Sequence, residues 1–252
     1  MFGFNRAKRP VELGPYPLEN LRRDASIAAV EGAAPPRDPG SLANGGSPYL
    51  VDATLTHLGA YEELREPEPF AKKAPVPEDL SLRTRDIKGA GYFLDASQIG
   101  ICAIADGVWL TPPRETHSHA VVVLIEYSDP IDADNSAAKW VAGNEHLLAT
   151  LRAAEIALDL GGQISAMGFD SRAHWTGASD VDLEKTAVVA GLAVRDSERA
   201  INPFVGDRFA LAVVTTDYAL AVDQPLHPSA RNGRSLSYQL GLSGAVSGLE
   251  RW

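Results

Sequence analysis

Two apolar runs rich in β-branched residues constrain the fold of this chain more than any other feature. The first, HAVVVLIEY, spans residues 119–127, and the second, RFALAVVTT, spans residues 208–216. Valine and isoleucine favour the pleated surface of a sheet, and apolar side chains at both odd and even positions leave neither face for water. Each run therefore predicts a buried strand in the middle of one main sheet.

A long amphipathic helix is predicted between the two strands, from residue 137 to residue 160. Its apolar side chains recur at the spacing of one helix face: Leu147, Leu151, Ala154 and Leu158. Gly161 and Gly162 follow, and glycine favours helix ends because it adopts the left-handed conformation of a C-terminal cap without strain. The next segment, QISAMGF at residues 163–169, is then predicted to be a short strand.

Further elements are predicted on either side of this helix. Residues 51–66 repeat apolar side chains every three positions, and residues 182–192 form another helical stretch. Ser179 precedes that stretch in a pattern typical of a capping box. Residues 99–105 indicate one more buried strand. Helices interleaved with apolar strands predict an α/β or α+β sandwich around one main sheet, and we expect the α+β class.

Proline and glycine divide the chain into three parts. Residues 1–50 contain these residues so often that no regular element is expected, and they are predicted to form an extended arm. Three apolar residues should anchor this arm on its own subunit or on a partner: Tyr16, Leu18 and Leu21. Residues 51–225 are the predicted domain, and residues 226–252 are a C-terminal tail.

Composition argues against several classes of function. With 23 basic and 33 acidic residues the net charge is -10, which disfavours nucleic-acid binding through a broad basic face. The single cysteine, Cys102, cannot supply the thiolates of an iron–sulfur cluster, so none is expected in this chain. The chain lacks an apolar run of the roughly 20 residues that a membrane span needs and lacks a secretory signal pattern. We therefore expect a cytoplasmic protein.

Few residues indicate chemistry on their own. His117 and His119 lie directly before the first strand, and side chains two positions apart share one side of an extended segment. Two imidazoles without an evident third ligand do not make a zinc site, so no metal is expected. The pair is interpreted as polar residues at the edge of a strand. Neither of the two common phosphate-binding glycine motifs is present.

The order of motifs in the second half resembles that of the reductive dehalogenases and epoxyqueuosine reductases, a family of cobalamin-dependent reductases. The resemblance rests on the first strand, the helix ending near Gly161, the turn Ala190-Gly191-Leu192, and GDRFALAVVTTDYALAVDQP at residues 206–225. The arm motif GPYPLENLRRD is similar to the opening of the soluble respiratory-type dehalogenases. This resemblance implies a nitroreductase-like layered sandwich with a central mixed sheet that holds a corrinoid, cobalamin.

The resemblance also implies site residues. Cobalamin is expected along the segment from Ala190 to Asp217, where glycine lets the backbone approach a flat ligand closely. The expected cofactor-binding residues are Gly191, Leu192, Gly206, Arg208, Thr216 and Asp217. Two catalytic residues are expected. Asp170 lies at the place of the acid in epoxyqueuosine reductases, and Tyr127 is the tyrosine best placed to donate a proton or to line the pocket.

The sequence departs from the family pattern in two places. Residues 193–198 replace the usual continuation after the Ala-Gly-Leu turn, and no cysteine follows Pro225, where the family carries ferredoxin-like motifs. A cobalamin-binding reductase of this kind would need an external electron-donor protein. Two alternatives stay open: a non-catalytic relative that acts as a subunit or interaction partner in a larger complex, and a relative of the flavin nitroreductases. A homo-oligomer is a further open alternative for the assembly of the chain.

Overall fold

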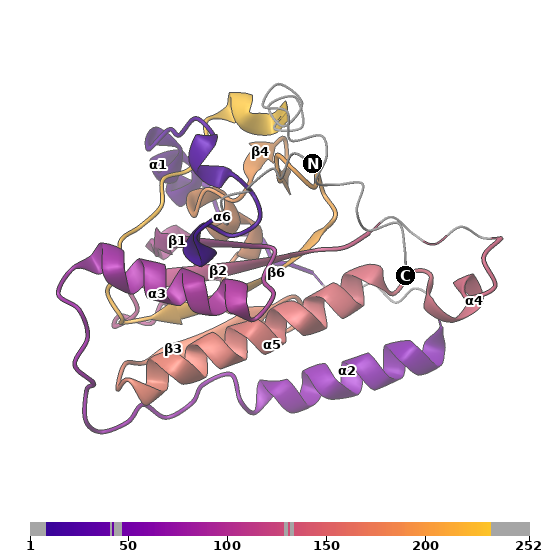
Figure 1. Ribbon diagram of the computed structural model, residues 1–252, viewed down its shortest axis with the longest axis horizontal. Helices are drawn as coiled ribbons and strands as arrows, with labels where there is room; N and C mark the ends of the chain where they lie inside the picture. The colour runs from indigo at the N-terminus through magenta and orange to yellow at the C-terminus, as the bar shows by residue number, and fades with distance from the viewer. Residues whose placement is uncertain (1–8, 41, 43–46, 129–130, 132–133, 233–252) are drawn as a thin grey trace, which may run out of the picture.

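The protein is built around one four-stranded antiparallel sheet, seen in a computed structural model (Figure 1). The structure describes residues 9–40, 42, 47–128, 131 and 134–232. The strand order is β1-β2-β6-β3, and the strands are β1 (Gln98–Ala103), β2 (His119–Glu126), β6 (Phe209–Thr216) and β3 (Ser171–Trp175). The chain therefore has an α+β fold, but the expectation of a mixed sheet is wrong, because every neighbouring pair is antiparallel.

The two predicted strands form the middle of this sheet. β2 and β6 pair from His119 opposite Thr216 to Glu126 opposite Phe209. The side chains of β2 from Ala120 to Leu124 are fully buried, since helices cover both faces of the sheet. The prediction of central strands at residues 119–127 and 208–216 is confirmed to within one residue at each end.

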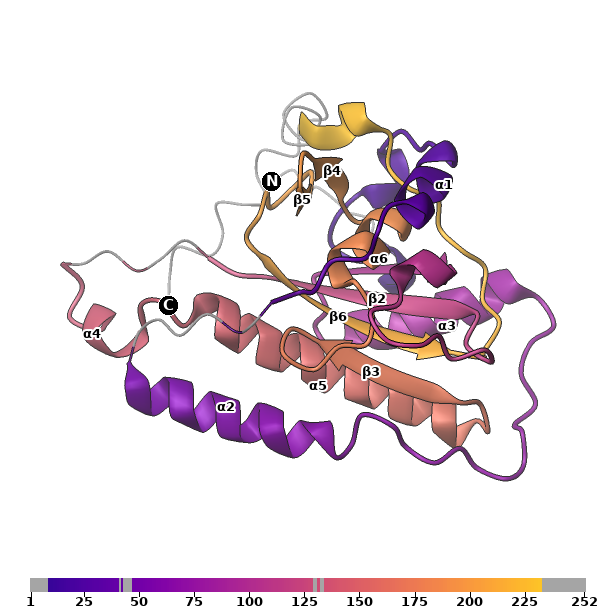
Figure 2. The ribbon, with the colours of Figure 1, turned by 180° about the vertical axis from the view of Figure 1, so that it is seen from behind.

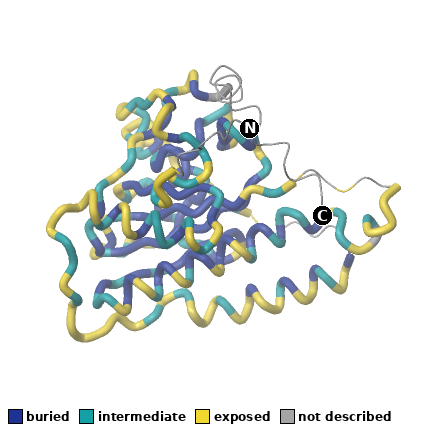
Figure 3. Tube along the Cα trace, viewed as in Figure 1, coloured by how far each residue is buried: buried dark blue, intermediate teal, exposed yellow. Residues whose placement is uncertain are grey.

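Helices lie in layers on the two faces, as Figures 1 and 2 show. α5 (Glu145–Ala166) crosses one face, and α2 (Pro48–Glu62) packs on the outer side of α5. α3 (Leu80–Phe93) contacts β1 and α5. The opposite face is covered by α6 (Leu183–Val189) and by α1 (Ser26–Ala33), which packs on α6. Buried residues concentrate in the sheet and in α5, whereas α2 buries only one side (Figure 3).

α5 differs from its prediction at both ends. It begins at Glu145, after a separate short helix α4 (Ala138–Val141), and it continues through the two glycines predicted to stop it. Gly161 is buried against the sheet, where its carbonyl accepts a hydrogen bond from Ser171 Oγ at 2.9 Å. This packing outweighs the cost of glycine in a helix, which is about 1 kcal/mol.

The true end of α5 follows from Gly168, which has a φ of 84°. The backbone N–H of this glycine donates to the Ser165 carbonyl at 2.9 Å and closes the last turn. The predicted strand at residues 163–169 is therefore wrong, because most of that segment is the last turn of α5. α3 has no counterpart in the sequence predictions.

The described part of the arm lies on its own chain, and it is not extended throughout, because it contains α1 and two short 3-10 helices, η1 (Val11–Leu13) and η2 (Leu18–Asn20). Two of its predicted anchors, Leu18 and Leu21, are buried in the core on the α6 side of the sheet. The ring of the third, Tyr16, packs against the ring of Phe204, with the ring centres 5.0 Å apart and the planes tilted by 42°. The prediction of spaced apolar anchors is confirmed.

The arm also pairs with the segment that follows β6. Arg23 forms an antiparallel bridge with Leu226. The Asp24 N–H donates to Pro225, and the His227 N–H donates to Arg22, both at 2.9 Å. The described part of the predicted tail thus belongs to the fold, and it ends in a 3-10 helix, η4 (Pro228–Asn232). The rest of that tail, residues 233–252, lies outside the described residues.

The fold also contains a small hairpin, and a side-chain cap begins α6. β4 (Val194–Asp196) and β5 (Arg199–Ile201) form a two-stranded sheet between α6 and β6. Asp182 caps α6 by accepting the Lys185 N–H at 2.9 Å, whereas Ser179, predicted to start a capping box, bonds to Val181. Among the described residues, no helix combines the length and hydropathy that crossing a membrane requires.

Candidate functional site

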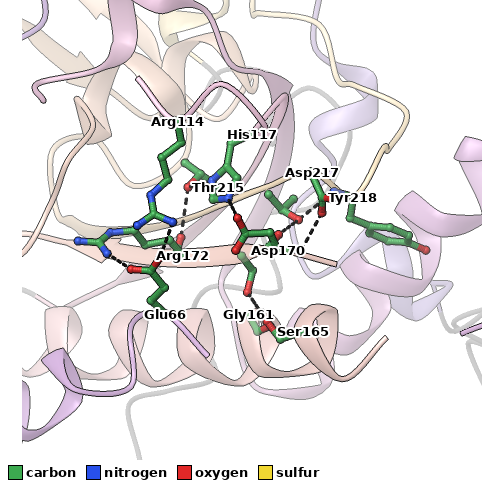
Figure 4. A network of polar contacts seen from close by, with 12 residues as sticks. Glu66, Arg114, His117, Gly161, Ser165, Asp170, Arg172, Thr215, Asp217 and Tyr218 are labelled. Atoms are coloured by element: carbon green, nitrogen blue, oxygen red, sulfur yellow. Dashed lines mark hydrogen bonds and ion pairs between the residues drawn. The ribbon is translucent and has the colours of Figure 1, made fainter. Parts of the chain in front are cut away.

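A line of polar side chains runs through the sheet at the end where β3 begins, and Figure 4 shows much of it. β6 places Thr215 in the sheet, and β3 places His174 beside it. His117 comes from the loop before β2, and Asp170 lies immediately before β3. The antiparallel pairing of β2, β6 and β3 brings these three chain segments together.

Thr215 joins the two histidines. Its Oγ1 lies 2.8 Å from His117 Nδ1 and 3.0 Å from His174 Nε2. At the outer end, His117 Nε2 lies 3.0 Å from Asp170 Oδ2, although the contact is not aligned as a hydrogen bond. We call these four residues the His-Thr-His-Asp chain.

The neighbours of this chain fix the direction of its protons. His174 Nδ1 accepts the Asp180 N–H at 3.2 Å, so a neutral His174 carries its proton on Nε2. That proton points to Thr215 Oγ1, and the Thr215 hydroxyl then donates to His117 Nδ1. His117 consequently carries its own proton on Nε2, facing the Asp170 carboxylate. The hydrogen bonds are thus ordered from the buried His174 through Thr215 to His117, and His117 Nε2 then lies 3.0 Å from Asp170.

Burial keeps both imidazoles neutral. His174 is fully buried, and desolvation together with nearby Arg65 and Arg172 holds its pKa well below the ordinary value. Desolvation also lowers the pKa of His117, and the neighbouring Asp170 opposes this shift only in part. The Asp170 side chain, by contrast, is 34% exposed. The His-Thr-His-Asp chain therefore runs from a fully buried imidazole to a carboxylate that is partly exposed at the surface.

The same residue types occur in hydrolytic triads, but the geometry excludes that chemistry here. A nucleophilic hydroxyl must reach a substrate, and Thr215 is 0% exposed in the middle of the sheet. Its hydroxyl is also engaged by two imidazoles at once. The arrangement can hold and orient a carboxylate, or move a proton along the line, but it cannot attack a bound molecule.

Ion pairs lie next to the His-Thr-His-Asp chain on the side of β3. Arg172 donates to Asp180 at 2.5 Å, and Arg65 lies 3.5 Å from the same carboxylate. Glu66 pairs with both Arg172 and Arg114. These contacts connect β3 to the segment after α2 and to the loop before β2.

Three of the residues predicted for the site meet at the Asp170 end. The Asp170 N–H donates to Asp217 Oδ1 at 2.8 Å, and the Thr216 hydroxyl donates to the Asp170 carbonyl at 2.6 Å. Asp217 also lies 3.9 Å from Lys73. The structure thus places one expected catalytic residue against two expected cofactor-binding residues, but the contacts are among the protein's own groups.

Three other predicted residues lie at the opposite end of β6. The Tyr127 N–H donates to the Arg208 carbonyl at 3.2 Å, next to the turn that contains Gly206. Phe209 and Thr216 bound β6, and seven steps along a strand span about 23 Å. Tyr127 and Asp170 therefore cannot act on the same atom. Burial raises the pKa of Tyr127, whose ring packs edge-on against His146 at 5.7 Å.

The last two predicted residues, Gly191 and Leu192, lie at the end of α6. Leu192 is buried, and Gly191 has a φ of 69°. A β-carbon on Gly191 would lie 2.0 Å from Nη1 of Arg23, so the arm already fills the space in front of this glycine. A cavity of about 320 Å³ lies beside these residues, between the arm and the domain.

Sequence reasoning missed His174, Thr215 and Arg23, and it interpreted His117 only as a polar residue at a strand edge. Thr215 and His174 each lie in a strand, where alternation reports which face a side chain occupies but not its neighbour across the sheet. The contact of Arg23 with Gly191 joins residues 168 positions apart. A local pattern could not have found these pairings.

Comparisons with known proteins point to one family. No protein-family profile and no curated protein sequence matches the chain. Among solved structures, a variant of the catabolic reductive dehalogenase NpRdhA matches 96% of this chain at 33% identity, with a TM-score of 0.81. A reductive dehalogenase structure described as suggesting a mechanism for B12-dependent dehalogenation matches 87% of this chain at 34% identity, with a TM-score of 0.76.

The match covers only part of those proteins. This chain spans 34% and 31% of the two dehalogenase chains, about a third of their length. An epoxyqueuosine reductase is also similar, at 13% identity and a TM-score of 0.44.

Proposed function

Because the chain is a relative of the reductive dehalogenases, we propose that it is a non-catalytic module of a B12-dependent reductive dehalogenation system. In this proposal, the chain keeps the fold and packs with a corrinoid-holding part of the system, which carries out the reduction. The observation that carries the proposal is the position of Arg23 over Gly191.

The guanidinium of Arg23 is built into the fold. Nη1 donates to the Gly191 carbonyl at 3.0 Å and to the Gln224 carbonyl at 2.7 Å, while Nη2 donates to the Leu18 carbonyl at 2.9 Å. Burial lowers the pKa of this side chain, because it removes water from the guanidinium. The three carbonyls replace the hydrogen bonds to water that the guanidinium loses. A corrinoid lying against Gly191 would have to displace a half-buried guanidinium and break these bonds.

The residues expected to hold the corrinoid do not fit that group. The cavity of about 320 Å³ beside Gly191 is at the low end of the volumes that drug-sized ligands occupy, and a corrinoid is larger than those ligands. Thr216 is fully buried and bonded to Asp170, and Gly206 lies at the other end of β6. The six residues thus occupy three separate places.

Thermal unfolding with added hydroxocobalamin tests this proposal. A ligand that binds only the folded state raises the melting temperature. We expect no shift and no change in the cobalamin absorption spectrum at micromolar concentrations of the wild-type chain. Arg23→Ala should lower the melting temperature, while Arg22→Ala, at the exposed neighbouring position, should not. Stoichiometric cobalamin binding by the wild-type chain would contradict the proposal.

The contacts between Asp170, Thr216 and Asp217 favour a second candidate, a cobalamin-binding reductase that takes electrons from an external donor protein. In that case cobalamin would bind, and Asp170→Asn would lower donor-driven turnover by about 100-fold, the scale of losing a general acid. The same titration with a flavin tests the nitroreductase alternative. A positive titration with either cofactor would replace the non-catalytic proposal.

A further inference from the structure

β3 is an edge strand whose outer side is paired at two places, at Trp175 by Ala178 of the following turn and at Ala173 by Arg65. The Ala173 N–H donates to the Arg65 carbonyl at 2.8 Å, and Arg65 Nε donates back to the Ala173 carbonyl at 2.9 Å. We call this reciprocal pair the Arg65 clamp. Native proteins cover exposed strand edges because unpaired backbone groups there invite pairing with other chains.

The clamp depends on a neutral histidine next to it. Arg65 Nη2 lies 3.3 Å from His174 Nδ1, which can accept a hydrogen bond only while it carries no proton. The same nitrogen accepts the Asp180 N–H at 3.2 Å. Protonation of Nδ1 would turn this acceptor into a donor that faces two other donors.

We propose that Arg65 and His174 form an acid-released clamp, in which protonation of His174 frees the outer edge of β3. This device is independent of the proposed function, because it involves neither a cofactor nor a partner.

The charged groups around His174 oppose a second positive charge. They come from every segment packed near it: Arg65 after α2, Arg114 and His117 before β2, Arg172 on β3, and Asp180 after β3. Asp180 is the carboxylate in this set, and its Oδ2 lies 3.8 Å from His174 Nδ1. That oxygen already pairs with Arg172 and Arg65, so it has little capacity to stabilise an imidazolium.

The sign of the effect follows from linkage. In the closed form, burial and the two facing donors disfavour a proton on His174. The proposed open form exposes the imidazole to water, where its ordinary pKa is about 6.5. Falling pH therefore favours the open form, by about tenfold for each pH unit below 6.5. Between pH 7.5 and pH 5.0 the opening equilibrium should rise by about thirtyfold.

Amide hydrogen exchange at pH 7.5 and pH 5.0, corrected for the intrinsic exchange rate, tests this device. We expect the protection of the Ala173 amide to fall by about thirtyfold at the lower pH. Low urea should not accelerate its exchange, because the opening is local. The amides of Val121 and Val122 in β2 should respond to urea, because they exchange through larger unfolding.

Two variants separate the clamp from general acid sensitivity. His174→Asn removes the titrating group but keeps an acceptor near the Nδ1 position, so the pH dependence at Ala173 should disappear. His119→Asn changes another histidine of the same sheet whose pKa is lowered by burial, and the pH dependence should remain. Arg65→Ala keeps the backbone carbonyl that accepts the Ala173 N–H but removes the guanidinium that donates back and holds this segment on β3, so the protection of Ala173 should fall at both pH values.

Any of three results would overturn the proposal. Ala173 protection could be equal at both pH values in the wild-type chain, or it could follow the Val122 amide under all conditions. Alternatively, Arg65→Ala could leave protection at Ala173 unchanged. The last measurement remains decisive even if His174→Asn does not fold.

Discussion

Nη1 of Arg23 lies 3.0 Å from the carbonyl oxygen of Gly191 and occupies the volume that a β-carbon of residue 191 would need. A glycine that sequence reasoning assigned to a flat cofactor is thus explained by an arginine of the same chain. The left-handed φ of 69° adds a second reason for glycine at this position.

Gly191→Ala should destabilise the protein by about 2 kcal/mol or more, because the new β-carbon meets Arg23 at 2.0 Å and the Gln224 carbonyl at 2.3 Å in a left-handed conformation. Urea unfolding followed by circular dichroism measures the change. The matched control is Gly162→Ala inside α5, where nothing lies within 4 Å of the new carbon. That variant should be more stable by about 0.5–1 kcal/mol. Equal effects of the two changes would contradict the steric account.

The free energy of unfolding should fall as the pH drops below about 6.5. Burial lowers the pKa of four histidines: His117, His119, His146 and His174. Below pH 6.5 the histidines of the unfolded chain bind protons, whereas the buried histidines of the folded chain stay neutral. Their contribution to the free energy of unfolding is therefore fully present above that pH and decreases below it. Each histidine contributes at most about 1.4 kcal/mol per pH unit.

Urea unfolding at a series of pH values between 5 and 8 checks this slope. His174→Asn should reduce the slope, because it removes one of the four buried groups. A wild-type stability that rises on acidification would show that the histidines are better solvated than their burial indicates.

Thr215→Val should cost about 3 kcal/mol, because the lost hydroxyl leaves a buried N–H of His174 and a buried acceptor of His117 without partners. Thr215→Ser keeps the hydroxyl and removes one buried methyl group, at a cost of about 1 kcal/mol. Unfolding free energies of the two variants give the comparison. If valine were tolerated as well as serine, the hydroxyl would contribute little to the His-Thr-His-Asp chain.

Asp182→Ala should cost about 2 kcal/mol, because this carboxylate serves two elements at once. It caps α6 through the Lys185 N–H at 2.9 Å and holds the arm through the Arg37 N–H at 2.8 Å. Asp79→Ala removes the cap of α3 alone, so it should cost about 1 kcal/mol or less. Limited proteolysis should also cut the Asp182→Ala protein near Arg37 faster than wild type. Equal cutting rates would show that the contact of Asp182 with the Arg37 N–H does not hold the arm in place.

The sequence predicted the centre of the fold better than its margins. Residues 120–124 are apolar at every position, so only a strand covered on both faces can bury them, and that constraint is local. The end of α5 depended instead on how closely Gly161 approaches Ser171 on β3, a tertiary contact. Intrinsic propensity favoured a stop at Gly161, and packing overrode it.

The candidate site was harder to predict. Asp170, Thr216 and Asp217 were named from the order of motifs, and the structure brings them together. Tyr127 was named in the same way, and it lies at the far end of β6. The order of motifs along the chain does not report the distance along a strand, and about 3.3 Å per residue soon separates groups that are neighbours in a motif.

The pairing of residues 22–24 with residues 225–227 has a consequence for the order in which the protein is made. A ribosome releases the arm first and its pairing segment about two hundred residues later. During that interval Leu18 and Leu21 have no β6 and no Leu226 to cover them. The contacts that bury the arm therefore form only after the segment that follows β6 has been made, long after the arm itself.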